Sequence, residues 1–398
     1  MPPATHIFEH TPESLAQWCE RCNMQPFRAK QVLEWVYLKG IIDPAAMSNL
    51  SKLDRDKLAA DIRFSTGDII KQQNATDGTQ KLLVQWHDRN NTAGAEVPQS
   101  PPSSPTSLPI LSNPQLDQTR QTECVMIPAE DRRTACISSQ VGCPVGCKFC
   151  ASGIGGLDEN LTAGKIVEQV WMLRKSMQEQ QAGRGTRNDG DFPRITNVVF
   201  MGMGEPLSNL ANVIPAIRTI CALWGHAISA RKVTISTVGL PKAIEKLAEQ
   251  LDLPITLALS LHAPNDTIRR QLIPWAEYTT ITDLLAACQK WFDKTGREIT
   301  LEYTLLRGVN DQPQHAKELA DIARTIRANI NLIRYNEVKG MPFDRPRDED
   351  VRGFQEYLQA KNLNVHIRAS RGRDIAAACG QLRHETGNKQ RKREATTS

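Results

Sequence analysis

From Arg133 onward, short apolar and β-branched runs alternate with longer amphipathic runs, and this alternation limits the folds open to the chain. The short runs predict strands at Thr134–Ser138, Asn197–Met201, Lys232–Ser236, Ile255–Ser260, Thr300–Leu305 and Ile330–Arg334. The longer runs predict helices at Ala163–Met177, Asn212–Trp224, Pro241–Gln250, Ile281–Lys294 and Pro313–Ile326. Such alternation is typical of parallel sheets with right-handed crossovers. Six units predict an open, partial (β/α)6 barrel with its functional side chains at the C-terminal ends of the strands.

The chain before and after the barrel divides into further parts. Residues 1–64 carry apolar side chains at helical spacing and predict a small N-terminal helical domain. Its Arg and Lys side chains could dock RNA, although a solvated charged face is equally consistent with them. Residues 65–128 predict a short β-hairpin extension, interrupted at 91–122 by a Pro/Ser-rich insertion that cannot bury a core. The barrel is expected over 129–384 and a basic flexible tail over 385–398. The predicted fold class is therefore α/β.

Composition narrows the classes of protein without selecting one. The chain has 398 residues and is 40% hydrophobic, which is enough for a sizeable core. It shows no apolar run of about 18 residues, so no membrane span is expected. The N-terminus lacks an apolar signal segment, and ten cysteines without one predict a reducing, cytoplasmic location. The net charge of +5 permits a nucleic-acid partner without demonstrating one.

Three closely spaced cysteines point to an iron–sulfur cluster. Cys143, Cys147 and Cys150 have the spacing C-x-x-x-C-x-x-C, so three thiolates can each bind one iron of a cubane cluster. No fourth cysteine follows nearby, which leaves one iron open to a chelating substrate, much as a catalytic zinc keeps an open position. A zinc ribbon is the alternative, but it needs a second cysteine or histidine pair, and none follows at that spacing.

Polar residues follow several of the predicted strands. The run from Met201 to Leu207 comes directly after the second strand and offers two glycines and one carboxylate. The candidate ligand-binding residues at these strand ends are Gly204, Glu205, Ser236, Ser260, Leu261, His262 and Asn336. Taken singly, each is more often a cap, a turn residue or a structural histidine. Their shared position at one rim indicates a common ligand.

Six of the other seven cysteines fall into two groups. Cys19 and Cys22 form a C-x-x-C without a second pair, and Cys221 and Cys288 lie inside predicted helices, so all four are interpreted as structural thiols. Cys136 precedes the cluster motif, and Cys379 lies near the C-terminus; burial as small hydrophobic residues is the simplest interpretation of these two as well.

The longer motifs favour another interpretation. The runs Cys136-Ile-Ser-Ser-Gln-Val-Gly-Cys143, Met201-Gly-Met-Gly-Glu-Pro-Leu207, Ser260-Leu-His-Ala-Pro-Asn-Asp266 and Ala378-Cys-Gly-Gln-Leu382 together resemble the RlmN/Cfr family of RNA adenosine methyltransferases, within the radical S-adenosylmethionine (SAM) superfamily. The resemblance covers about Gln25 to Leu382 apart from the insertion. It implies one 4Fe-4S cluster and two SAM molecules per turnover.

The resemblance also implies roles for individual residues. Cys143, Cys147 and Cys150 match the cluster ligands, and the seven strand-end residues named above match SAM contacts. Cys379 matches the cysteine that becomes methylated, Cys136 the resolving cysteine and Glu123 the general base. By this resemblance the methylated Cys379 is converted to a radical that adds to the adenine, and a transient disulfide with Cys136 then releases the product.

The expected substrate is an adenosine in the peptidyl-transferase region of 23S rRNA, together with the adenosine 3′ to the tRNA anticodon. Methylation at carbon 2 is the prediction, and carbon-8 methylation of the Cfr type is the alternative. A flavodoxin-like electron donor, a monomeric state and no membrane partner are also expected. Two other classes stay open. Another radical SAM enzyme, such as an activase, would need no paired Cys136 and Cys379, and a non-enzymatic RNA-binding or iron–sulfur storage protein would not cleave SAM.

Overall fold

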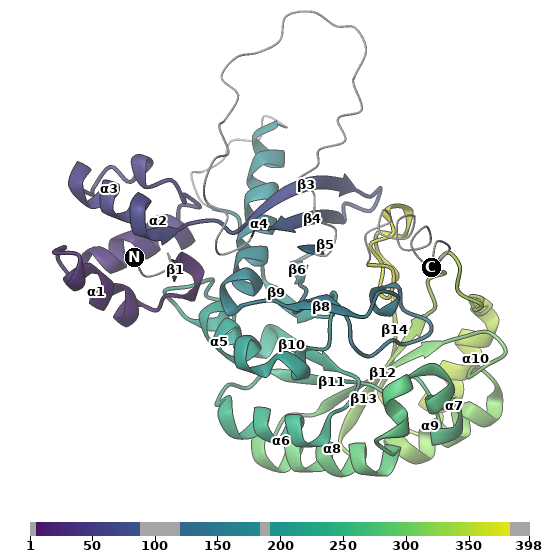
Figure 1. Ribbon diagram of the computed structural model, residues 1–398. Coiled ribbons are helices and arrows are strands. Elements are labelled where there is room, and N and C mark those ends of the chain that lie inside the picture. Colours follow the sequence, from purple (N-terminus) through teal and green to yellow (C-terminus); the bar gives the residue numbers. More distant parts are fainter. Residues whose placement is uncertain (1–4, 88–119, 184–191, 383–398) are drawn as a thin grey trace, which may run out of the picture.

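The computed structural model describes residues 5–87, 120–183 and 192–382. Within them, one ten-stranded sheet forms the centre of the molecule, in the order β14-β13-β12-β11-β10-β9-β6-β5-β4-β3 (Figure 1). Its strands are β3 (Gly67–Asn74), β4 (Gln80–Trp86), β5 (Gln121–Ala129), β6 (Arg132–Cys136), β9 (Asn197–Phe200), β10 (Val233–Thr237), β11 (Thr256–Ser260), β12 (Ile299–Leu305), β13 (Ala328–Arg334) and β14 (Val365–Arg368). Two small sheets pair β1 (Thr5–His6) with β2 (Ile62–Arg63) and β7 (Gln140–Gly142) with β8 (Leu157–Asn160).

The helices flank this sheet. They are α1 (Pro12–Arg21), α2 (Arg28–Tyr37), α3 (Lys52–Asp61), α4 (Ala163–Gly183), α5 (Leu210–Cys221), α6 (Pro241–Gln250), α7 (Asp266–Leu272), α8 (Ile281–Thr295), α9 (Pro313–Ala323) and α10 (Asp348–Gln359). Helices α1, α2 and α3 gather at one side, whereas α6, α8 and α9 lie along the outside of the barrel strands (Figure 1). Within the described residues, none of the helices combines the length and apolar character that a membrane crossing requires.

The predicted partial barrel is confirmed. Strand β6 pairs in parallel with β9, and each later strand pairs in parallel with the one before it, as far as β14. The sequence analysis did not foresee β14, which follows α10 and closes this end of the sheet. Its four residues alternate between Val365 and Ile367 on one face and the polar His366 and Arg368 on the other, so they form no apolar run that a strand search detects.

The hairpin is continuous with the barrel sheet. Strand β4 pairs antiparallel with β3 and β5, and β5 pairs antiparallel with β6. Strand β5 begins at Gln121, so the last two residues of the expected insertion belong to the strand. Gln85 stands directly opposite Gln121, and the intervening chain therefore leaves and re-enters the sheet at neighbouring positions. The rest of the insertion up to residue 119 and the expected tail lie outside the described residues.

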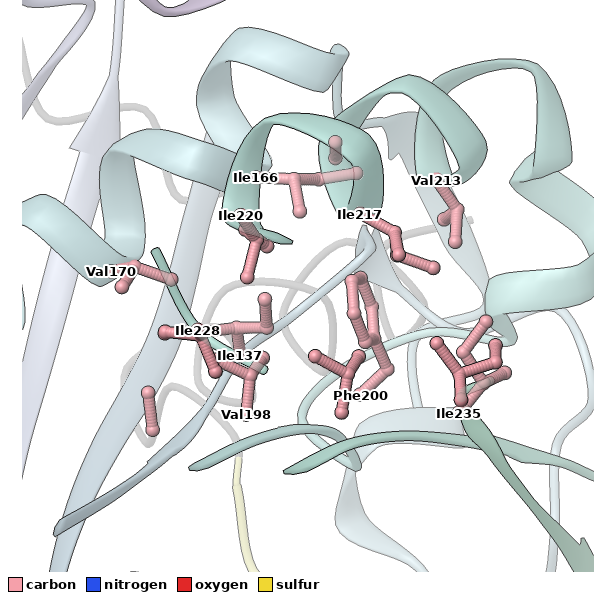
Figure 2. Close-up of a cluster of buried hydrophobic side chains, with 14 of the residues drawn as sticks. Ile137, Ile166, Val170, Val198, Phe200, Val213, Ile217, Ile220, Ile228 and Ile235 are labelled. Atoms are coloured by element: carbon pink, nitrogen blue, oxygen red, sulfur yellow. The ribbon is translucent and has the colours of Figure 1, made fainter. Parts of the chain in front are cut away.

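The barrel strands bury apolar side chains under the helices and turn polar ones inward. In β10, Val233 and Ile235 are fully buried in the main core, while Thr234 and Ser236 line cavities inside the barrel. Figure 2 shows the core layer between strands and helices, with Ile166, Val170, Val213, Ile217 and Ile220 facing Val198, Phe200 and Ile235. Each such buried side chain stabilises the fold by about 1.5–3 kcal/mol. The main core thus lies outside the barrel, and the lumen carries both polar and apolar side chains.

A buried carboxylate joins the N-terminal segment to the barrel. Glu168 of α4 accepts hydrogen bonds from the Ser65 hydroxyl at 2.6 Å and from the Thr66 hydroxyl at 2.6 Å and amide at 3.0 Å. The His6 ring lies 3.2 Å from the same carboxylate, and Trp171 of α4 donates to the Val36 carbonyl at 3.0 Å. These contacts fix α4 to chain segments from both ends of the helical region.

Candidate active site

A pocket opens at the C-terminal ends of the barrel strands, as the sequence predicts. The expected site residues that line it are Cys143, Cys147, Cys150, Gly204, Glu205, Ser236, Ser260, His262, Asn336 and Cys379. They come from the loop after β7, from the loops after β9, β11 and β13, from the end of β10 and from the C-terminal loop. Residues more than 230 positions apart in the chain thus meet at one site.

The cysteine loop presents its thiols in an apolar setting. Gly142 has φ +76, and a Cβ there would collide with the carbonyl oxygen of Gly156, so only glycine allows this turn. The three thiols pack against a small core that includes Val145 and Phe149. Burial raises the pKa of the Cys143 thiol to about 12 and also raises that of Cys147 and Cys150. The free protein therefore holds neutral thiols there, and iron binding would release their protons.

This donor set fits an iron–sulfur cluster. Within the described residues, no three His, Cys, Asp or Glu side chains are grouped to hold a single metal ion. A cubane cluster does not need such a group, because each thiolate binds a different iron. Three thiols around one pocket, beside a carboxylate and several polar groups, match a cluster with an open iron. Cys143, Cys147 and Cys150 are the residues that would hold it.

Glu205 lies at the pocket with its carboxylate fixed by backbone donors. Its two oxygens accept from the Val238 amide at 2.8 Å and the Leu207 amide at 3.0 Å. Burial outweighs these bonds and raises the pKa of Glu205 to about 7. A carboxyl group with this pKa can become an anion when a cationic ligand arrives.

This raised pKa predicts a pH-dependent stability. Because the folded protein favours protonated Glu205, its contribution to stability is full below the ordinary value and is lost as pH rises toward about 7. In the cofactor-free protein, Glu205→Gln should therefore stabilise the fold relative to wild type by about 3 kcal/mol near pH 8 and by little near pH 4. Denaturant unfolding across this range measures the difference, with Glu245→Gln on α6 as the matched control. A constant difference at all pH values would contradict it.

His262 is held in a conformation that few non-glycine residues adopt. Its φ is +55, and the Thr304 amide donates to its Nδ1 at 3.1 Å while Asn310 donates to its carbonyl at 2.8 Å. Burial lowers the pKa of His262 to about 3, so its ring is neutral and can donate from Nε2. Leu261 beside it does not line the pocket, and its side chain is buried in the main core.

Three neighbouring segments hold the loop that carries Cys379. The Ala151 amide, beside the cluster cysteines, donates to the Gly380 carbonyl at 2.7 Å. Asn336 donates to the Cys379 carbonyl at 3.3 Å. From the β3–β4 turn, Asp77 accepts from the Gly372 amide at 3.0 Å. The loop is therefore positioned by the cluster loop, the barrel rim and the hairpin together.

Cys379 and Cys136 meet in a second, larger cavity. Both line it, and Cys379 also lines the first pocket, whereas the three cluster cysteines line only the first. Burial, together with the nearby Cys379 thiol, raises the pKa of the Cys136 thiol to about 12. Both cysteines are free thiols.

Two residues near these thiols were not foreseen from the sequence. Arg368 at the end of β14 lies 3.1 Å from the Met201 sulfur and 3.9 Å from the Glu302 carboxylate. The charges of Cys379 and Glu302 raise the pKa of its guanidinium. An isolated Arg on an unrecognised strand and a Glu within an apolar strand carry no motif, so sequence analysis had no signal for either.

Glu123 lies beside neither cavity but in a buried ion pair. Its carboxylate is 2.8 Å from the Lys81 ammonium, which also donates to the Ala376 carbonyl at 3.1 Å. Both side chains are about 95% buried, with 4% of Glu123 and 5% of Lys81 exposed. Lys81 thus links Glu123 to the loop of Cys379, and it too was missed by the sequence analysis.

Comparison with known proteins agrees with this geometry. Residues 5–63 match the family described as ribosomal RNA large subunit methyltransferase N-terminal domain, and residues 137–320 match the radical SAM superfamily. A dual-specificity RNA methyltransferase RlmN from Dichelobacter nodosus is 39% identical over 95% of this chain and 93% of its own length. A probable RlmN from Thermosynechococcus vestitus is 40% identical over 93% of this chain and 95% of its own length.

A solved structure resembles the whole molecule. The radical SAM methyltransferase from Sphaerobacter thermophilus is 35% identical, with a TM-score of 0.81 over 95% of this chain and 99% of that one. The cofactors of this family, a 4Fe-4S cluster and SAM, fit the thiols and the polar pocket described above. The chain belongs to the RlmN family of radical SAM RNA methyltransferases.

Proposed function

We propose that this enzyme methylates carbon 2 of an adenosine in the peptidyl-transferase region of 23S rRNA, and of the adenosine 3′ to the tRNA anticodon. The dual-specificity names of its relatives support both substrates. The observation that carries the proposal is the position of Cys379, which lines both the cofactor pocket and the larger cavity, while Cys136 lines the larger cavity alone. A methyl carrier needs access to both the methyl donor and the substrate.

The residues of the chain divide the chemistry between them. When bound, the cluster and SAM supply the methyl group and the radical that activates it. The Cys379 thiolate would accept the methyl group. One hydrogen atom would leave that methyl group for the SAM-derived radical, its carbon would then bond to carbon 2 of the adenine, and the one electron left over on the adduct would return to the cluster. We assign removal of the carbon-2 proton to Glu123 through the family resemblance alone, since Glu123 lines neither cavity. The Cys136 thiolate would then attack the Cys379 sulfur, and the carbon released from that sulfur would take up a proton. The resulting disulfide frees the methylated base, and a cellular thiol reopens it by exchange.

The strand-end residues are proposed to hold SAM. Glu205 would receive the SAM ammonium group, because its carboxyl group is buried at the pocket and can ionise beside a cation. The Ser236 and Ser260 hydroxyls lie 3.1 Å apart and can together bind a polar group of the ligand. Gly204 has φ +104, and its backbone can approach the ligand closely. His262 and Asn336 would add donors, and Leu261 would contribute backbone only.

The site of methylation can be read from isotope loss. RNA hairpins that carry deuterium at carbon 2 or at carbon 8 of the target adenosine are incubated with the reconstituted enzyme, and the digested nucleosides are weighed by mass spectrometry. Loss of the carbon-2 label alone is the expected result. Loss of the carbon-8 label instead would overturn the carbon-2 assignment in favour of the Cfr-type alternative.

The Lys81–Glu123 ion pair predicts that Lys81 affects the rate of product release. A carboxylate that accepts a proton must be ionised beforehand, and the adjacent ammonium stabilises that state. Lys81→Met should slow product release by about 100-fold, the usual contribution of a general base. Carbon-2 deuteration should then give a primary isotope effect absent from wild type, while Lys81→Arg restores part of the rate. A slow variant without an isotope effect would argue against a role in proton removal.

The remaining proposals concern the partners of the protein, its oligomeric state and its location in the cell. We propose that the helices of residues 5–63 contact RNA, since this region matches a domain specific to rRNA methyltransferases. A flavodoxin-like electron donor, a monomeric enzyme and a cytoplasmic location complete the proposal. Free thiols throughout the described residues support a reducing environment.

A further inference from the structure

The larger cavity runs through the barrel to the end opposite the cluster. At one end it is lined by Met201 and Asn336, which follow the C-terminal ends of β9 and β13. At the other it reaches Asn197 and Lys232, at or just before the first residues of β9 and β10. Its volume is about 700 Å³, within the usual range of about 300–1,000 Å³ for ligand pockets.

This end of the barrel departs from ordinary barrel packing. In closed (β/α) barrels the lumen is filled by bulky apolar side chains, and the N-terminal ends of the strands serve stability. Here the cavity wall carries Asn197, Thr234 and Asn331, and Asn331 donates to Glu302 at 3.0 Å. Polar side chains that line an open cavity can contact a polar ligand.

The wall is also strongly basic. Arg132, Arg231, Lys232 and Arg371 line the cavity and are exposed at its mouth. Among the described residues, no Asp or Glu contributes to this wall. The whole chain has nearly balanced charges, with 49 basic and 44 acidic residues. A cavity wall with only basic charged residues is therefore a local concentration of positive charge. Such a concentration attracts a polyanion.

On the cofactor side, two loops are bonded to each other beside the pocket. The cluster loop and the C-terminal loop are joined by the Ala151 bond to Gly380 and by a 2.9 Å bond from the Ser152 hydroxyl to the Leu382 carbonyl. By contrast, Cys136 and Cys379 both face the larger cavity. A substrate that reaches these thiols through the larger cavity does not need to separate the two loops at the cofactor pocket.

We propose that RNA enters the barrel from the N-terminal ends of its strands, and that Arg132, Arg231, Lys232 and Arg371 bind the phosphates flanking the target adenosine. This rests on the proposed function, because it assumes that Cys379 delivers its carbon to an adenosine. The flipped base would extend along the lumen, and the backbone would stay at the basic mouth.

The test compares two double variants with equal loss of charge. Arg231→Ala/Lys232→Ala removes two cations at the cavity mouth, and Lys242→Ala/Lys246→Ala removes two exposed cations on α6, outside the barrel. The binding constant of a fluorescent anticodon stem–loop RNA is measured over a range of salt concentrations. For single strands, each lost phosphate contact lowers the slope of log affinity against log salt by about 0.7.

The expected result is a slope lower by about 1.4 and about tenfold weaker binding for the mouth variant, with the α6 variant unchanged. Equal behaviour of both variants and wild type would overturn the entry route, and so would equal weakening in both. Thermal unfolding shows whether each variant is folded.

Methylation of Cys379, read by peptide mass spectrometry, needs no RNA and separates the two hypotheses. If wild type lacks the methyl group, the proposed function fails whatever the binding data show. If Cys379 is methylated in wild type but the mouth variant binds RNA as tightly as wild type does, only the entry route is refuted. A charge-reversed Arg231→Glu variant provides a second check, because it should weaken binding more than the alanine change does.

Discussion

Replacing Cys136 with alanine should leave RNA covalently attached to Cys379 and abolish multiple turnover. The carbon bridge between the Cys379 sulfur and the adenine is broken only when a second sulfur attacks Cys379. Cys136 is the cysteine placed for this, because it alone shares the larger cavity with Cys379 within the described residues. Burial raises the pKa of its thiol to about 12, so the thiol must lose its proton before it can attack.

The experiment uses protein purified anaerobically with its cluster, from cells that supply the RNA. The peptide that carries Cys379 is digested and weighed by mass spectrometry in the variant and in wild type. An attached nucleotide with one bridging carbon, found only in Cys136→Ala, is the expected outcome. Cys288→Ala serves as the control, because Cys288 is also a buried thiol but belongs to the main core. An unmodified Cys379 in both proteins, despite an intact cluster, would rule out the methyl-carrier mechanism.

Among the substitutions proposed for this protein, removing the carboxylate of Glu168 should lower the free energy of unfolding the most. This side chain is 1% exposed, and its substitution by alanine leaves Ser65, Thr66 and His6 without their shared acceptor. Each buried donor left without its acceptor costs about 1–3 kcal/mol, so the loss should reach about 3–5 kcal/mol. Denaturant unfolding should show this loss, because the affected contacts join the N-terminal segment to α4.

The pH dependence of this loss has a defined sign. Burial alone would raise the pKa of Glu168, but His6 and the hydroxyls of Ser65 and Thr66 lower it below its ordinary value of 4.5. Its contribution is therefore present above the ordinary value and is lost as pH falls through the lower folded value. The difference between wild type and Glu168→Ala should shrink in acid. Glu179→Ala, an exposed change on the same helix, should cost under about 0.5 kcal/mol at every pH.

Much of the fold follows from local patterns. The strand from Ile299 to Leu305 and the helix from Pro241 to Gln250 are visible in the sequence because apolar side chains recur at the period of each element. Strand β14 escapes such a search, since it holds only two apolar residues, Val365 and Ile367, and so short an alternation does not stand out from loop sequence. The register of the hairpin against the barrel depends on pairing between β5 and β6, which no local pattern encodes.

The candidate site also contains some features that the sequence predicts and others that it does not. Cys143 and Glu205 belong to contiguous motifs, so their meeting in one pocket could be expected from strand ends alone. It could not be expected from the sequence that Cys136 lines a different cavity from the cluster cysteines. This arrangement depends on the three-dimensional position of Cys379, which lines both cavities. Lys81 was missed for a related reason: its ion pair with Glu123 forms across neighbouring strands and leaves no trace along the chain.

The pairing of Gln85 with Gln121 has a practical consequence for protein engineering. The ends of the intervening segment are fixed at adjacent positions of the sheet, whatever lies between them. The entropic cost of closing such a segment grows by only about 0.6 kcal/mol for each doubling of its length. The opposite end of the hairpin, where Asp77 bonds to the loop of Cys379, is the one that touches the catalytic machinery. A fluorescent reporter or purification handle grafted between residues 88 and 119 should therefore leave catalysis intact.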